Sequence, residues 1–168
     1  MRHTNRSADC IIIEMIPEFE NLRQDEIEAL LIAPVMVSIL IAGADDNIDK
    51  NEIKEAVATA KSKQTRAREG LVDYYKMVAE NFESDLHRLI DELPDSAAQR
   101  NPVLTKELRR LNRIFIKLDT PFATKIYGSL RDMAKRVAEA SGGILGYMAV
   151  SYEEAKLLEL EMINDPSK

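Results

Sequence analysis

The sequence of 168 residues has a single cysteine, Cys10, no tryptophan, and aromatic side chains at only 5% of its positions. One cysteine can form neither an intrachain disulfide nor a zinc site built on several thiolates, which favours a reducing compartment. Six glycines and six prolines, together with so few aromatic residues, are too few turn and strand formers for a many-stranded sandwich or barrel. The sequence therefore predicts an all-α protein.

Long hydrophobic runs are also missing. The longest uncharged stretch, residues 29–44, falls short of the roughly 20 apolar residues that span a bilayer. The N-terminus lacks the pattern of a secretory signal. Hydrophobic residues make up 45% of the chain and charged residues 31%, close to the average for soluble domains. We therefore expect a cytoplasmic domain, and any membrane contact would be indirect, through a partner.

Capping signals and hydrophobic periodicity predict a single bundle of about seven mostly antiparallel helices. Residues 25–42 are apolar nearly all round and begin with a capping box of Asp25 and Glu28, so we expect this helix to be the enclosed centre of the bundle. A kink is expected at Pro34, inside this helix. The other expected helices are a short one at 9–22, divided by Pro17, and longer ones at 50–68, 71–93, 101–118, 120–141 and 152–163.

Two of these helices are expected to begin at a proline. In both 101–102 (Asn-Pro) and 120–121 (Thr-Pro), a capping residue precedes a proline at the first helical position. We expect the residues just before the first of these pairs, 95–100, to form a polar loop. The predicted organisation is an N-terminal extension at 1–24, a helical domain at 25–163 and a C-terminal tail at 164–168.

An acidic loop follows the central apolar helix. It cannot be a complete EF-hand, because Ile41 and Gly43 would fall at ligand positions. Carboxylates and backbone carbonyls could still share a divalent cation, either calcium, magnesium, manganese or zinc. The alternative is that Asp49 and Glu52 only cap the helix that they begin. The candidate metal ligands are Asp45, Asp46, Asp49 and Glu52.

Three segments of the sequence resemble the tellurite-resistance TerB-like family: 44–52 (ADDNIDKNE), 140–146 (ASGGILG) and 150–154 (VSYEE). The similarity extends over about residues 25–163. It implies an all-helical fold of antiparallel helices, a cytoplasmic location, and an acidic first loop that binds divalent metal ions. It also implies partners in stress-response or membrane-associated complexes, without catalytic activity. The family usually has glycine where this chain has Asp46, a position suited to a positive φ.

Charge is segregated along the chain, whose net charge is −6. Residues 1–60 hold 12 acidic and 5 basic residues, whereas 97–136 hold 10 basic and 3 acidic residues. Five cations in the second segment follow helical spacing beside an apolar stripe, which predicts a basic ridge for an anionic partner. The alternative is a solvated face that pairs with acidic neighbours. The ridge residues are Lys106, Arg109, Arg110, Arg113 and Lys117.

No nucleophile and base can be paired from the sequence, so we expect a protein without catalytic activity. A nucleic-acid partner is not expected, because nucleic-acid-binding domains are usually strongly basic. Two hypotheses follow. In the first, the chain is a TerB-like stress or tellurite-resistance protein that binds a divalent cation at its acidic loop and partners through its charged faces. In the second, it is a metal-free helical interaction module that docks an anionic partner through the basic ridge. We expect a protein partner in both, with a homodimer as one form that it could take.

Overall fold

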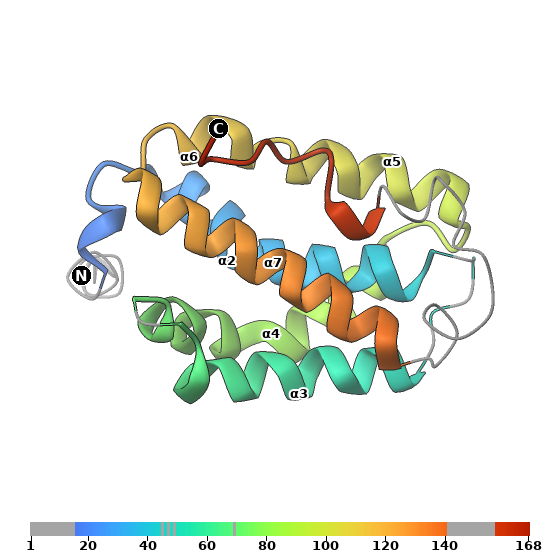
Figure 1. Cartoon of the computed structure of the whole chain (residues 1–168). Helices are drawn as coiled ribbons and strands as arrows, with labels where there is room; N and C mark the ends of the chain where they lie inside the picture. Colours follow the sequence, from blue (N-terminus) through green and yellow to red (C-terminus); the bar gives the residue numbers. More distant parts are fainter. Residues whose placement is uncertain (1–15, 45, 47, 49, 69, 141–156) are drawn as a thin grey trace, which may run out of the picture.

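The computed structural model describes residues 16–44, 46, 48, 50–68, 70–140 and 157–168, and within these residues all regular structure is helical. Figure 1 shows three layers, in which α2 and α7 lie between the pair α3 and α4 and the pair α5 and α6, and successive long helices reverse direction. The elements are a 3₁₀ turn η1 (Pro17–Phe19) and the helices α2 (Gln24–Ala42), α3 (Lys50–Arg66), α4 (Val72–Glu92), α5 (Ala97–Leu108), α6 (Leu111–Phe115) and α7 (Thr120–Ala140). The expected all-α bundle is thus confirmed, with six α-helices in the part of the chain described.

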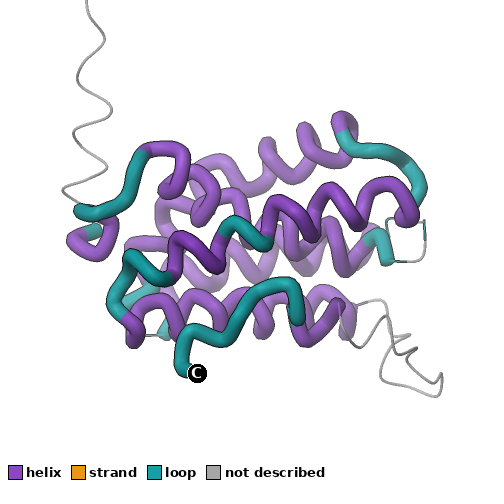
Figure 2. Tube along the Cα trace, turned by 90° about the horizontal axis from the view of Figure 1, so that it is seen from above, coloured by secondary structure: helices purple, strands orange, loops and turns teal. Residues whose placement is uncertain are grey.

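Helix α2 is the centre of the bundle. It packs against α3, α4, α5, α6 and α7, and consecutive residues that point to different sides of the helix, Val37, Ser38 and Ile39, are completely buried. Burial of apolar surface, at about 25 cal/mol per Å², therefore stabilises the fold mainly around this helix. Figure 2, viewed from above, shows the long helices running side by side. None of the helices in the described ranges is long and apolar enough to cross a bilayer.

The middle of α2 depends on a side chain from α4. Pro34 lies inside α2 and lacks the N–H that would bond to the carbonyl of Leu30. The buried hydroxyl of Tyr74 donates to that carbonyl at 2.7 Å, and Ser38 Oγ donates to the Pro34 carbonyl at 2.7 Å. Burial, with a smaller contribution from the adjacent Tyr75, raises the pKa of Tyr74 well above its usual value, so the hydroxyl keeps its proton. Helix α2 therefore continues through Pro34.

Two predicted features of the helix starts are wrong, namely the capping box of α2 and the first residue of α5. Helix α2 begins at Gln24, and its capping carboxylate is Glu26, which accepts the backbone N–H of Arg23 at 2.9 Å; Asp25 and Glu28 are not a capping box. Helix α5 begins four residues before the predicted start, so most of the expected polar loop is helical and Pro102 lies inside the helix. The physical reason is a contact at its first turn from a residue 51 positions earlier, which local sequence cannot reveal.

The predicted helix 101–118 is divided in two. Between α5 and α6 the backbone N–H groups of Arg110 and Arg113 bond to carbonyls three residues earlier, at 3.0 and 3.1 Å, as in a 3₁₀ turn. Helix α7 begins at Thr120, as expected, but its cap is Asp119, whose carboxylate accepts the N–H of Phe122 at 3.1 Å.

The C-terminal segment packs beside α5, α6 and α7. Of the predicted helix 152–163, residues 152–156 lie outside the described part, 157–159 are helical, and the chain then turns at Leu160, whose φ is 52°. Leu160 and Ile163 are buried in the core. The amide of Asn112 donates to the Met162 carbonyl at 3.1 Å and accepts the N–H of residue 164 at 2.8 Å. The tail is thereby fastened to α6.

Candidate functional site

The acidic loop is tied to the first turn of α5. Asp45 and Asp49 lie outside the described residues. Asp46 has a left-handed φ of 72°, a conformation that costs an ordinary L-residue roughly 1–2 kcal/mol and that Asp tolerates better than most. Its carboxylate accepts the backbone N–H of Ala97 at 2.5 Å. Asp46 thus caps α5 from a distant loop, while Glu52 is only 5% exposed in the first turn of α3.

A buried arginine lies next to this loop. Arg100, 2% exposed, donates from its guanidinium to the carbonyls of Gly43 at 2.5 Å and Asp95 at 2.6 Å. A Cβ on Gly43 would come within 2.8 Å of Arg100 Cζ, so this close approach requires glycine. The guanidinium therefore supplies a positive charge at the carboxyl end of α2, where the helix dipole is negative.

The described residues of the loop fit helix capping better than metal binding. Within the described ranges, no group of three or more His, Cys, Asp or Glu side chains is placed to hold a metal ion. The Asp46 carboxylate already binds a backbone N–H, and the Gly43 carbonyl already binds a guanidinium. A divalent cation at this place would also be repelled by the charge of Arg100.

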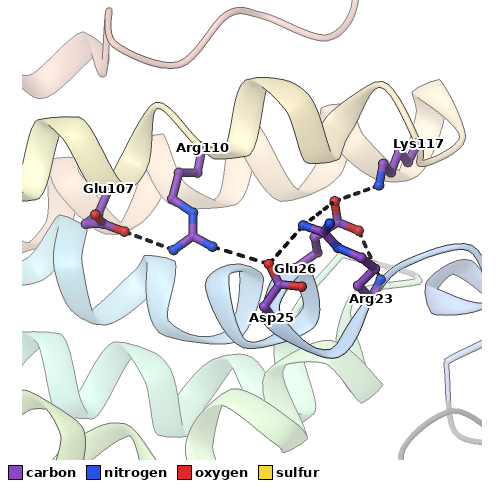
Figure 3. Close-up of polar contacts among 6 residues, drawn as sticks. All are labelled: Arg23, Asp25, Glu26, Glu107, Arg110 and Lys117. Atoms are coloured by element: carbon purple, nitrogen blue, oxygen red, sulfur yellow. Dashed lines mark hydrogen bonds and ion pairs between the residues drawn. The ribbon is translucent and has the colours of Figure 1, made fainter.

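The predicted basic ridge separates into two groups. Two of its five members hold α5 and α6 to the first turn of α2, as Figure 3 shows. Arg110 contacts Glu107 at 3.0 Å and Asp25 at 3.6 Å, and Lys117 contacts Glu26 at 2.6 Å. The N–H of Arg23, followed by Lys117, lowers the pKa of Glu26. For this group, pairing with acidic neighbours is confirmed.

The other three cations of the ridge are exposed, and none has an acidic partner among the residues that the structure describes. Val103 and Ile116, 43% and 85% exposed, are the large hydrophobic residues on the described surface, and they lie before and after these cations. Steps of three and four residues in helical or 3₁₀ backbone keep side chains on one broad face. We call this face the basic strip. It consists of Val103, Lys106, Arg109, Arg113 and Ile116.

A second polar cluster joins three helices and was not found from the sequence. Tyr75 Oη lies 2.5 Å from Ser129 Oγ, and Lys63 Nζ donates to Ser129 Oγ at 3.1 Å and to Asp132 at 2.8 Å. Desolvation raises the pKa of Asp132, but Lys63 and Arg136 together outweigh it, so the pKa of this carboxyl is lowered. Ser129 and Asp132 lie three residues apart on α7, a spacing that places them on one face. Lys63 and Tyr75 come from α3 and α4, so only the fold reveals the cluster.

A serine within reach of a lysine is the arrangement of an activated nucleophile, but the surroundings here oppose that chemistry. Lys63 Nζ donates to both Ser129 Oγ and the Asp132 carboxylate, so it faces the serine as a hydrogen-bond donor and not as a base. Ser129 is 5% exposed, which closes Oγ to a substrate. Desolvation raises the pKa of Tyr75, so its hydroxyl also stays protonated. This cluster is therefore suited to holding α3, α4 and α7 together.

Comparison with protein-family models, with curated proteins and with solved structures gave no match.

Proposed function

We propose that this chain is a non-enzymatic helical interaction module that docks an anionic protein partner through the basic strip. The observation that carries the proposal is that Lys106, Arg109 and Arg113 remain exposed and unpaired with acids of the described residues, whereas their neighbours Arg110 and Lys117 are paired. Lys106, Arg109 and Arg113 therefore form no ion pair that holds the described helices together. They are accordingly available to a partner.

The composition of the basic strip indicates the kind of partner. Arginine is enriched among interface residues that contribute most to affinity, and exposed aliphatic side chains gain free energy when a partner covers them. A row of cations flanked by Val103 and Ile116 is complementary to an acidic helix with an apolar face. Charge complementarity of this kind raises the association rate and selects partners.

As part of this proposal, we assign the chain to the TerB-like family, with a cytoplasmic location and a role in stress or tellurite resistance. This assignment is supported by the three sequence segments and by the left-handed φ of Asp46, at the position where the family has glycine. Segment 150–154 and all but the first residue of 140–146 lie outside the described residues. Divalent-cation binding stays a prediction of the sequence.

The proposal can be tested with a synthetic helix of glutamate and leucine as the acidic probe. We expect the protein to bind this probe at low salt, and the Arg109→Glu/Arg113→Glu variant to bind it at least tenfold more weakly, because each reversal replaces attraction by repulsion. The matched control is Lys54→Glu/Arg66→Glu, an identical charge change at two exposed residues of α3. Fluorescence anisotropy gives the affinities. Equal losses in the two double variants would mean that only net charge matters and would refute the basic strip.

A further inference from the structure

A groove of about 420 Å³ follows the amino-terminal half of α2, between α4 and α5. Both α4 and α5 pack on α2 but have little contact with each other. Because α2 is apolar on all its sides, this gap leaves apolar side chains incompletely covered. Leu31, Ile32 and Met36 form the floor and are only partly buried, unlike the rest of the middle of the helix.

The groove is elongated. Its α2 side extends from Asp25 to Met36, which at 1.5 Å per residue corresponds to about 16 Å or three helical turns. A compact small molecule would leave part of such a length empty, whereas a helix uses anchors at i, i+3 or i+4 and i+7 along it. Met36 and Met77 line the groove, and methionine adapts its shape to varied apolar partners.

Carboxylates outnumber cations at the rim. The acidic residues of the rim come from three helices. Each of the two rim cations is bound to a rim carboxylate: Arg88 lies 2.8 Å from Asp85, and Arg110 lies 3.0 Å from Glu107. Glu28 is exposed, and its hydrogen bond comes from the neutral amide of Gln24 at 3.2 Å. The acidic rim residues are Asp25, Glu28, Asp85 and Glu107.

We propose that this groove binds a cationic amphipathic helix of a partner protein. The apolar face of that helix covers Leu31, Ile32 and Met36, and its lysine or arginine side chains pair with the rim, Glu28 above all. The groove shares the end of α5 and the start of α6 with the basic strip, but the two surfaces select partners of opposite charge. The protein can thus join a basic partner to an acidic one.

The probe for the test is a synthetic helix with leucine at i, i+3, i+4 and i+7 and lysine elsewhere. We expect Glu28→Lys to weaken its binding about fivefold, because a rim attraction becomes a repulsion. Ile32→Ala should weaken it about tenfold, because the floor loses apolar area. Glu20→Lys, an exposed residue away from the groove, is the control for net charge and should change affinity less than twofold. Circular dichroism verifies that each variant is folded.

Several outcomes would overturn the proposal. They are absence of binding to the folded wild type, equal affinities for Glu28→Lys and Glu20→Lys, or an unchanged affinity of Ile32→Ala. Self-association that Glu28→Lys abolishes would assign the groove to a second copy instead, and binding of the apolar dye ANS without binding of the helix would assign it to a small ligand. The Arg109→Glu/Arg113→Glu variant should still bind the lysine probe, so this proposal can fail independently of the basic strip.

Discussion

The two ends of α2 satisfy the same electrostatic requirement in opposite ways. At the amino end, Asp25 and Glu26 face the positive end of the helix dipole and bind cations near the surface. At the carboxyl end, one buried guanidinium, Arg100, binds the Gly43 carbonyl directly. The first arrangement is partly exposed and shared by several side chains, whereas the second is buried and depends on a single arginine. We therefore expect the carboxyl end to be far more sensitive to substitution.

The largest effect should come from Gly43→Ala. The added Cβ would collide with Arg100 and force the guanidinium from its carbonyl partners, which should lower the free energy of unfolding by about 3 kcal/mol. Gly43 has a φ of −109°, which alanine can adopt, so the cause is the contact and not the backbone. Urea denaturation measures the loss.

A double-mutant cycle isolates this contact. Arg100→Ala alone should cost about 3 kcal/mol, because it leaves buried carbonyls unpaired. In the Arg100→Ala background, Gly43→Ala should add almost nothing, since the clash is gone. If Gly43→Ala costs the same in both backgrounds, the proposed reason for this glycine is incorrect.

An intermediate effect is expected for Asp46→Ala, in the loop that follows the carboxyl end of α2. The variant loses the cap on Ala97 and puts alanine at a left-handed φ, for a combined cost of about 2 kcal/mol. Asp46→Asn keeps an acceptor oxygen and tolerates this φ, so it should cost less than about 0.5 kcal/mol. Thermal and urea unfolding compare the variants.

The exposed Asp95 offers a control nearby, and Asp95→Ala should be almost neutral. If Asp46→Asn proves as destabilising as Asp46→Ala, the negative charge of Asp46 matters more than its hydrogen bond.

The smallest effect should be at the amino end of α2, and it should depend on pH. The lowered pKa of Glu26 means that its ionised form stabilises the fold above the unfolded pKa, near 4.5, and that this stabilisation disappears as the pH falls through the folded pKa. Glu26→Gln should therefore be less stable than the wild type at neutral pH, with the difference shrinking on acidification. A series of urea midpoints against pH measures it.

The exposed pair of Arg110 and Asp25, 3.6 Å apart, is the reference for an ordinary surface contact. Arg110→Ala should change stability by less than about 0.5 kcal/mol. A difference between Glu26→Gln and wild type that stays constant down to acidic pH would contradict the assignment of the stabilisation to the Glu26 carboxylate.

Local signals predicted much of the fold and little of the site. The bounds of α3, α4 and α7 are within about two residues of the prediction, because capping and periodicity act over one or two turns. The start of α5 was missed because its partner, Asp46, is distant in sequence. Spacing identified the cations of the ridge, but only the fold could show that Arg110 and Lys117 are paired, while Arg109 has no acidic partner among the described residues.

The bond from Tyr74 to Leu30 has a consequence for how the protein folds. Alone in water, the segment of α2 around Pro34 has a gap in its ladder of backbone bonds, and short isolated helices are already marginal. The Leu30 carbonyl gains its hydrogen bond only when α4 packs against α2 and brings the Tyr74 hydroxyl to it. Formation of helix α2 and packing of the neighbouring helices should therefore be one cooperative event, because the central helix reaches its full set of hydrogen bonds only in contact with α4.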